Sequence, residues 1–259
     1  MVSLSLSSYV KAGDEHNHVE IAQVGSSDNF DLSIEQIGFE THARFSFSHN
    51  NNTVDLLQSG NNMYFGYTDA WGSGYSWGGD LDGLRNDVEV RQKCSASSCN
   101  ANDFQFHILG DDNTVKFGQG YSLNDSTTPT WSYDNNEPGG NFVRLDIHGD
   151  DNTFIGSQKM DTNTISHSII ANIYTDNNDV YVRQAQNGNK SFTLTIRNSN
   201  GNDVSVNQRD NGAHTATVSL LGSQPTDLTL VQKGNTNQSY SLSQNCVTVG
   251  GCSISVTQE

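Results

Sequence analysis

A seven-residue pattern, Asn-x-apolar-x-apolar-x-Gln, recurs ten times along the chain, from residues 17–23 to 252–258. Its apolar and polar positions alternate, which is the period of a β-strand with one buried face. Asn opens seven copies and Gln closes all ten; these amides are Asn17, Asn52, Asn86, Asn113, Asn152, Asn178 and Asn202, and Gln23, Gln36, Gln58, Gln92, Gln119, Gln158, Gln184, Gln208, Gln232 and Gln258. The pattern predicts strands whose inner face carries two aliphatic side chains between two amides.

Buried amides need partners, because an amide that is buried without a hydrogen bond costs a few kcal/mol. Identical amides on strands stacked about 4.8 Å apart can donate and accept along a column, as in cross-β ladders. Such a ladder requires one copy per layer, directly above the last. We therefore expect the Asn and Gln columns to be the core that determines folding and assembly.

A second, looser set of alternating segments lies between successive copies. These segments are residues 42–48, 104–109, 142–147, 169–173, 192–196, 215–220 and 240–242. Turn-forming runs such as residues 110–113 and 198–202 separate the two sets. The sequence therefore predicts an all-β fold, a single β-solenoid domain over residues 1–259 with about nine two-strand coils and stacked Asn/Gln ladders.

Two aromatic-rich loop insertions interrupt the rhythm, at residues 63–85 and 120–141. They contain all three tryptophans, Trp71, Trp77 and Trp131. Exposed aromatic side chains on loops often contact sugars or protein partners. The same loops could instead fold back over a sheet of their own subunit, and the sequence leaves both interpretations open.

Composition narrows the class of partner. A net charge of −16 with only 13 basic residues disfavours nucleic acid, since no basic cluster or stripe appears. No segment is long and apolar enough for a membrane span, so we expect a protein that is not embedded in a membrane. No secretory signal is visible at the start, so a secreted protein would already have lost it.

The four cysteines form two short-range pairs, Cys94 with Cys99 and Cys246 with Cys252. Each bridge would close a short loop beside a motif strand, and two disulfides would indicate an oxidising compartment. Zinc binding and four free thiols are the alternatives, although neither pair has the usual zinc-ligand spacing.

Candidate chemistry is sparse. We find no Ser/His/Asp arrangement, P-loop or zinc-protease signature, and therefore expect no catalytic residues, no metal and no cofactor. Asp111 with Asp112 and Asp150 with Asp151 stand at equivalent positions in successive repeats. Turn formation explains both acidic pairs, and calcium binding there is left open.

The repeats resemble those of the curlins, the subunits of bacterial curli fibres. That family's repeat is Ser-x5-Gln-x-Gly-x2-Asn-x5-Gln, with alternate positions facing inward. Its central part is matched by Gln232, Gly234, Asn237 and Ser239, and nearly matched by Gln36, Gly38, Thr41 and Ala43. The pairs Gln23 with Gly25 and Gln58 with Gly60 match its turn alone. Asn replaces Ser at the first ladder position, so the chain looks like a divergent curlin-like protein.

The resemblance implies secretion across a bacterial outer membrane and assembly into an extracellular amyloid-like fibre on the cell surface, for biofilm or adhesion. The implied partners are further copies of the chain, a nucleator subunit and outer-membrane secretion factors, and polysaccharide binding through the tryptophan loops is compatible with a fibre. Independently, the chain ends on a complete motif strand, and an open coil invites head-to-tail stacking into a filament.

Two other classes of solenoid remain as alternatives. A secreted polysaccharide-degrading β-helix enzyme usually has three strands per coil and a cleft lined with acidic and basic residues. The second alternative is a secreted carbohydrate-binding or ice-binding solenoid, and ice binding would need a regular Thr-x-Thr column on one face. The two-strand spacing disfavours the enzyme and the mixed outward positions disfavour ice binding, so we favour the structural fibre subunit.

Overall fold

The computed structural model describes most of the repeat strands and several of the connections between them. The described residues are 5–10, 17–23, 30–39, 41–48, 52–61, 63–65, 79–82, 85, 87–94, 102–108, 112–119, 141–148, 151–158, 167–174, 177, 179–186, 188–197, 202–221, 227–245 and 252–259. All regular structure within these residues is β-strand. The predicted all-β class is confirmed.

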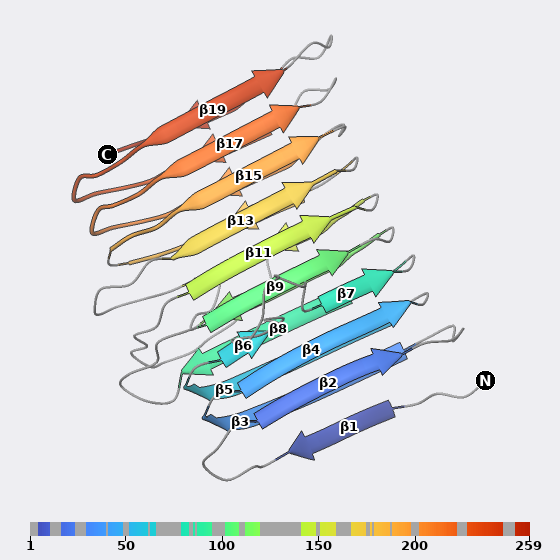
Figure 1. Cartoon of the computed structure of the whole chain (residues 1–259). Coiled ribbons are helices and arrows are strands. Elements are labelled where there is room, and N and C mark those ends of the chain that lie inside the picture. The colour runs from blue at the N-terminus through green and yellow to red at the C-terminus, as the bar shows by residue number, and fades with distance from the viewer. Residues whose placement is uncertain are drawn as a thin grey trace, which may run out of the picture.

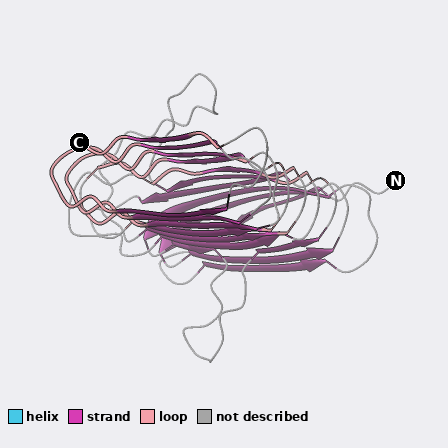
Figure 2. Cartoon of the chain, turned by 90° about the horizontal axis from the view of Figure 1, so that it is seen from above, coloured by secondary structure: helices cyan, strands magenta, loops and turns pink. Residues whose placement is uncertain are grey.

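The strands form two parallel sheets that lie face to face as two layers (Figures 1 and 2). The first, here called the ladder sheet, contains β1 (Ser5–Val10), β3 (Phe30–Phe39), β5 (Asn52–Asn61), β8 (Asp87–Cys94), β10 (Thr114–Gln119), β12 (Thr153–Ile155), β14 (Asp179–Val182), β16 (Asp203–Val206), β18 (Asp227–Leu230) and β20 (Ile254–Val256), in that order. The second, the return sheet, contains β2 (Asn17–Gln23), β4 (Thr41–Ser48), β6 (Met63–Phe65), β7 (Gly79–Asp82), β9 (Asn102–Ile108), β11 (Asn141–Ile147), β13 (Ser168–Ile173), β15 (Phe192–Arg197), β17 (Ala216–Leu221) and β19 (Tyr240–Asn245).

The chain alternates between the two sheets, so each pair of strands is one coil of a β-solenoid. Strands β6 and β7 together occupy one strand position in the return sheet, because both pair with β4 on one side and with β9 on the other. The described strands therefore make about nine two-strand coils, as the repeat spacing predicts.

The core lies between the sheets and follows the alternation of the sequence. Along β14, β16 and β18, residues are alternately exposed or half-buried and fully buried. The register places equivalent apolar positions directly over one another, for example Val180, Val204 and Leu228. In the middle coils the core is aromatic, with Phe104, Phe117 and Phe154 stacked in series at ring-centroid distances of 5.7 and 5.4 Å.

Tight connections require left-handed backbone positions. Asp112, Asp151 and Asn177 have φ of 53°, 55° and 57°, each just before a motif's first position. The prediction that Asp112 and Asp151 are turn residues is thus confirmed, whereas Asp111 and Asp150 lie outside the described residues. On the opposite side of the solenoid, Gly212 has φ of 72°, and a Cβ there would lie 2.7 Å from the Asn235 carbonyl oxygen. Successive connections therefore stack in direct contact.

Part of the first predicted loop is strand. Residues 63–85 include β6 and β7, and the side chains of Met63 and Phe65 are fully buried in the core. The aromatic composition of this segment obscured its two short strands, so the prediction of a loop over its whole length was wrong. Trp71, Trp77 and Trp131 lie outside the described residues.

Candidate functional site: the glutamine column and the solenoid edge

Eight glutamines stack in a single column at the end of the ladder-sheet strands. The strand registers pair Gln36 with Gln58, Gln58 with Gln92 and Gln92 with Gln119, and an isolated bridge continues from Gln119 to Gln158. The column is completed by Gln184, Gln208 and Gln232, and all eight side chains are at most 1% exposed. Period-two alternation explains this placement, because the seventh motif residue faces the same side as the apolar third and fifth.

The amides bond to one another along the column. Gln58 Nε2 donates to Gln36 Oε1 and Gln92 Nε2 to Gln58 Oε1, each at 2.8 Å. The series continues in the second half, where Gln184 donates to Gln208 at 2.7 Å and Gln208 to Gln232 at 2.6 Å. Buried amides are thereby satisfied by their own copies in the neighbouring coils, as the ladder hypothesis predicts.

The ladder has two opposite polarities, which the sequence did not reveal. In the first half each Nε2 donates toward the β1 end, including Gln119 to Gln92 at 2.8 Å. In the second half each donates toward the β20 end, beginning with Gln158 to Gln184 at 3.0 Å. The two runs meet between β10 and β12, where Gln158 Oε1 is buried and accepts no hydrogen bond.

Several glutamines of the column also tie the two sheets together. Gln184 Nε2 donates to the Ser191 carbonyl oxygen at 3.0 Å, and Gln208 Nε2 donates to that of Thr215 at the same distance. Gln232 Nε2 makes the equivalent bond to Ser239 at 2.7 Å. All three acceptors lie seven residues after their donors, where the chain enters the return sheet. One amide therefore links neighbouring coils. It also closes the arc of its own coil, meaning the connection that leads from the ladder sheet to the return sheet.

The asparagines occupy the other end of the inner face. Asn113, Asn152 and Asn202 are buried at the first motif position. The strands place Asn17 in β2 and Asn52 in β5, but their side chains are not described. Asn86 and Asn178 lie outside the described residues altogether.

The first motif copy does not belong to the column. Gln23 is in β2 and pairs with Phe47, so it lies in the return sheet. The residue at the ladder register in β1 is Val10, opposite Gln36. The prediction that Asn17 and Gln23 join the ladder of the later copies was wrong, because the spacing of 13 positions from Gln23 to Gln36 spans only half a coil.

At the other end, the ladder reaches the edge of the solenoid. Gln232 Nε2 donates to Oε1 of Gln258 at 2.7 Å, and Gln258 is exposed. The neighbouring inward positions of β20, Ile254 and Val256, are 44% and 40% exposed, whereas the corresponding positions Leu228 and Leu230 in β18 are buried. The edge therefore exposes the inward-facing side chains of one strand, two apolar residues and one amide, to solvent.

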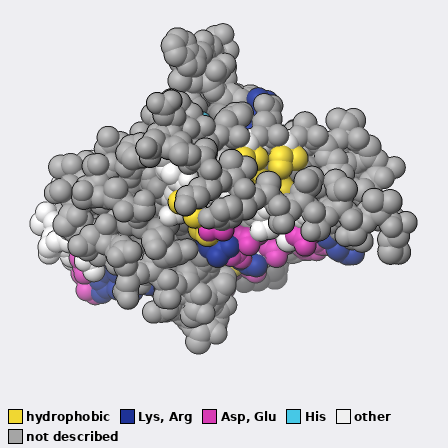
Figure 3. Space-filling model, turned by 90° about the horizontal axis from the view of Figure 1, so that it is seen from below, with side chains coloured by type: hydrophobic (Ala, Val, Ile, Leu, Met, Phe, Trp, Pro, Cys, Tyr) yellow, Lys and Arg dark blue, Asp and Glu magenta, His cyan; other side chains and the backbone are white. Residues whose placement is uncertain are grey.

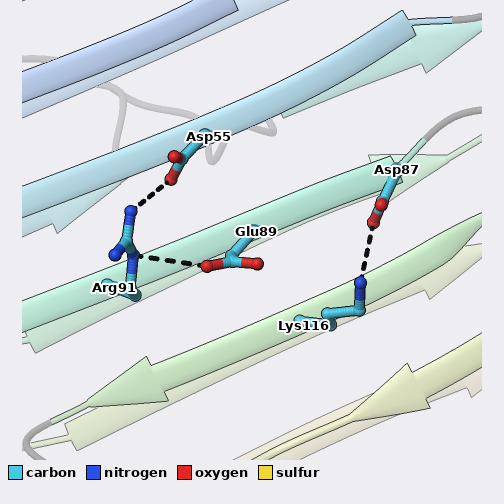
Figure 4. Close-up of polar contacts among 5 residues, drawn as sticks. All are labelled: Asp55, Asp87, Glu89, Arg91 and Lys116. Carbon is cyan, nitrogen blue, oxygen red and sulfur yellow. Dashed lines mark hydrogen bonds and ion pairs between the residues drawn. The ribbon is translucent and has the colours of Figure 1, made fainter. Parts of the chain in front are cut away.

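Charged side chains lie on the outer face of the ladder sheet. Arg91 bonds Asp55 of the neighbouring strand at 2.7 Å and lies 3.4 Å from Glu89, while Lys116 is 3.5 Å from Asp87 (Figure 4). Burial raises the pKa of Glu89, and Arg91 opposes that shift in part. Seen from the β1 end, acidic and basic side chains lie side by side along one edge of the molecule (Figure 3). These pairs join adjacent coils from outside.

Farther along the same face, three acidic residues occupy one column. Asp179, Asp203 and Asp227 are register partners on β14, β16 and β18 and are all exposed. Partial burial and then the two neighbouring carboxylates raise the pKa of Asp203. Like charges one strand apart oppose the stacking that the glutamines favour.

Of the four cysteines predicted to form disulfides, one has a described side chain. Cys252 is disulfide-bonded. Its predicted partner Cys246 and also Cys99 lie outside the described residues, and only the backbone of Cys94 is described. The pairings Cys94–Cys99 and Cys246–Cys252 therefore stay predictions.

Neither a metal-binding cluster nor a membrane-spanning helix lies in the described residues. Among them, no group of three or more His, Cys, Asp or Glu side chains could hold a metal ion. Within the same residues, no helix is long and apolar enough to cross a membrane.

Sequence reasoning missed a buried ionisable column beside the glutamines. His167, Lys190 and His214 are at most 1% exposed. Lys190 and His214 each stand six residues after a ladder glutamine, as Gln238 does in the next coil. That repeated spacing was the signal in the sequence that could have revealed them.

Comparison of the chain with protein-family models, curated proteins and solved structures found no match. What the structure establishes is a parallel β-solenoid with a stacked glutamine ladder, which is consistent with curlin-like repeats.

Proposed function

We propose that this chain is a structural subunit of an extracellular, curli-like amyloid fibre, assembled by head-to-tail stacking of solenoids. The observation that carries the proposal is the hydrogen-bonded glutamine column, which continues to Gln258 at an edge where Ile254 and Val256 are exposed. A coil of a second copy laid on this edge would cover the apolar side chains. It would also bond the open backbone edge.

Strand direction supports this stacking. Both β1 and β20 belong to the ladder sheet, and both β2 and β19 belong to the return sheet, with every neighbouring pair parallel. A copy placed with its β1 on β20 therefore keeps all strands of each sheet parallel. Contact between two different surfaces of the same molecule does not close on itself, so it generates a filament.

The joint between copies would differ from an internal layer. Val10 holds the ladder register in β1, so the amide of Gln258 would meet an apolar residue there. The joint is then sealed by apolar contact and backbone bonds, and the amide ladder restarts at Gln36. This makes Ile254 and Val256 the decisive side chains of the proposed joint.

The disulfide, the net charge and the proposed partners are each compatible with an extracellular fibre. The disulfide at Cys252 supports an oxidising, extracellular setting on a bacterial cell surface. The net charge of −16 would keep subunits soluble until their ends meet. The proposed partners are other copies of the chain, a nucleator subunit and outer-membrane secretion factors, with polysaccharide as a further ligand. No catalytic role is assigned.

Seeded elongation of the purified chain tests the proposal. Val256→Lys places a charge on the inner face of the edge strand, and Ser255→Lys places the same charge on the outer face of that strand. Under the proposal the parent chain and Ser255→Lys lengthen into unbranched filaments, whereas Val256→Lys does not. Elongation that is equal for both lysine variants, or a parent chain that stays monomeric, would overturn it and direct attention to a binding solenoid.

A further inference from the structure

A column of polar side chains, three of them ionisable, lies inside the arcs between the ladder sheet and the return sheet. His167, Lys190, His214 and Gln238 each stand two residues before strand positions that pair with one another, namely Ile169, Phe192, Ala216 and Tyr240. They are therefore stacked one strand spacing apart, about 4.8 Å. We propose that this column is an acid-sensitive latch: protonation of His167 and His214 opens the arcs of the coils that lead to the β20 edge.

Three members of the column, Lys190, His214 and Gln238, bond backbone carbonyl oxygens of the arcs. Lys190 Nζ donates to the carbonyl oxygen of Asp210 at 3.0 Å, reaching into the next coil. His214 Nε2 donates to the carbonyl oxygen of Arg209. Gln238 Nε2 donates to that of Lys233 at 2.6 Å. In three successive arcs, the residue two positions before the return strand thus donates a side-chain hydrogen bond to a backbone carbonyl oxygen.

Asp210 connects these arcs to one another. Its carbonyl oxygen accepts from Lys190 of the preceding coil, and its Oδ1 accepts from the backbone nitrogen of Gly234 in the following coil at 3.2 Å. Asp210 therefore links the coil of Lys190 to the coil of Gly234 through its own coil.

The two histidines are poorly placed to carry charge. Burial, followed by the nearby Lys190, lowers the pKa of His167 to about 3, which the backbone of Asn189 offsets only in part. Burial, followed by Lys190, also lowers the pKa of His214 to about 4, against Asp210 and the backbone of Thr236. Both imidazoles are therefore neutral in the folded chain at pH 7.

The other charged groups that face the column do not reverse this preference. Burial lowers the pKa of Lys190 to about 8, with Asp210 opposing the shift, so the ammonium is still mostly charged at pH 7. The glutamine column beside it is uncharged. Each histidine that gains a proton therefore adds a second positive charge next to Lys190. Within the described part of the chain, Asp210 is the only carboxylate that acts on these three ionisable groups.

The direction of the pH effect follows from these shifts. A histidine whose pKa is lowered on folding binds its proton more tightly when the chain is unfolded, so acid favours unfolding below pH 6.5. With folded pKa values of about 3 and about 4, each histidine raises the unfolding equilibrium constant about 30-fold between pH 7.5 and pH 5. Together they raise the unfolding equilibrium constant about a thousandfold. This loss of stability applies to the folded chain whether or not it assembles.

The chain supplies its own neutral replacement, because Gln238 fills the same position one coil later. We would compare urea unfolding of the parent chain, the double variant H167Q/H214Q and the control variant His107→Gln, which changes a histidine on the outer face of β9. Between pH 7.5 and pH 5, the unfolding equilibrium constant of the parent and of the control should rise about a thousandfold more than that of the double variant. Parallel pH profiles for all three would overturn the proposal.

Proton NMR titration of the histidine rings provides a second test that needs no variant. The proposal requires two rings of the folded parent chain to remain neutral at pH 5. If all rings titrate near pH 6.5 while the chain stays folded, the latch does not exist.

Discussion

The phenyl ring of Phe117 occupies the space that a side chain at Gly156 would fill. A Cβ on Gly156 would lie 2.4 Å from Cζ and 2.7 Å from Cε1 of that ring. The two residues are the fifth motif positions of successive coils, and Gly156 is the one fifth position among the ten that is not apolar. A large side chain in one coil is thus matched by the absence of one in the next.

We expect Gly156→Val to destabilise the solenoid, although valine restores the motif. Overpacking of a filled core costs about 1–3 kcal/mol. Urea unfolding measures this loss, and adding Phe117→Leu to the same chain should recover part of it. A Gly156→Val chain as stable as the parent would show that the ring moves aside freely.

The ladder predicts that an inner amide matters more than an outer one of the same type. Gln184→Ala removes the acceptor of Gln158 and the donor of Gln208, leaving buried groups unpaired at about 1–3 kcal/mol. Gln186→Ala changes an exposed glutamine two residues away and should be within about 0.5 kcal/mol of the parent. Equal losses in urea unfolding would contradict the ladder as the source of stability.

The outer ion pairs should contribute much less. Arg91 is 28% exposed and its partner Asp55 is 43% exposed, so solvent screens their attraction. We expect Arg91→Gln to lower the free energy of unfolding by less than about 1 kcal/mol, with the difference shrinking as salt is added. A loss larger than that of Gln184→Ala would place the decisive contacts on the surface.

The acidic column should respond to pH in the opposite direction to the histidines. The pKa of Asp203 is raised by partial burial and then by Asp179 and Asp227, so its charged form is disfavoured in the folded chain. Asp203→Asn should therefore raise the thermal midpoint at pH 7 and low salt. That gain should disappear as the pH falls toward 3.8, the ordinary value for an aspartate. A variant that melts below the parent at pH 7 would contradict this account.

Much of the solenoid was predictable because the pattern has the period of a strand and recurs at the length of a coil. The column from Gln36 to Gln232 follows from that pattern alone. Gln23 was misplaced because strands of both sheets alternate in the same way, so the motif does not say which sheet a copy joins. Only its half-coil distance from Gln36 carried that information.

Other features depend on contacts between coils, which a single-copy pattern does not contain. Gly156 is an exception to the motif until the ring of Phe117 is placed beside it. The change of ladder polarity at Gln158 depends on how each amide turns within its column. Lys190 and His214 belong to arcs, where turn-forming residues obscure a repeat of inward positions.

The central claim is that the solenoid continues from one copy to the next. The most direct test is fibre diffraction from the purified, incubated chain, with electron micrographs of the same sample. The account predicts unbranched filaments with a meridional reflection near 4.8 Å, the spacing between stacked coils. Stable monomers at high concentration, with no such reflection, would contradict it.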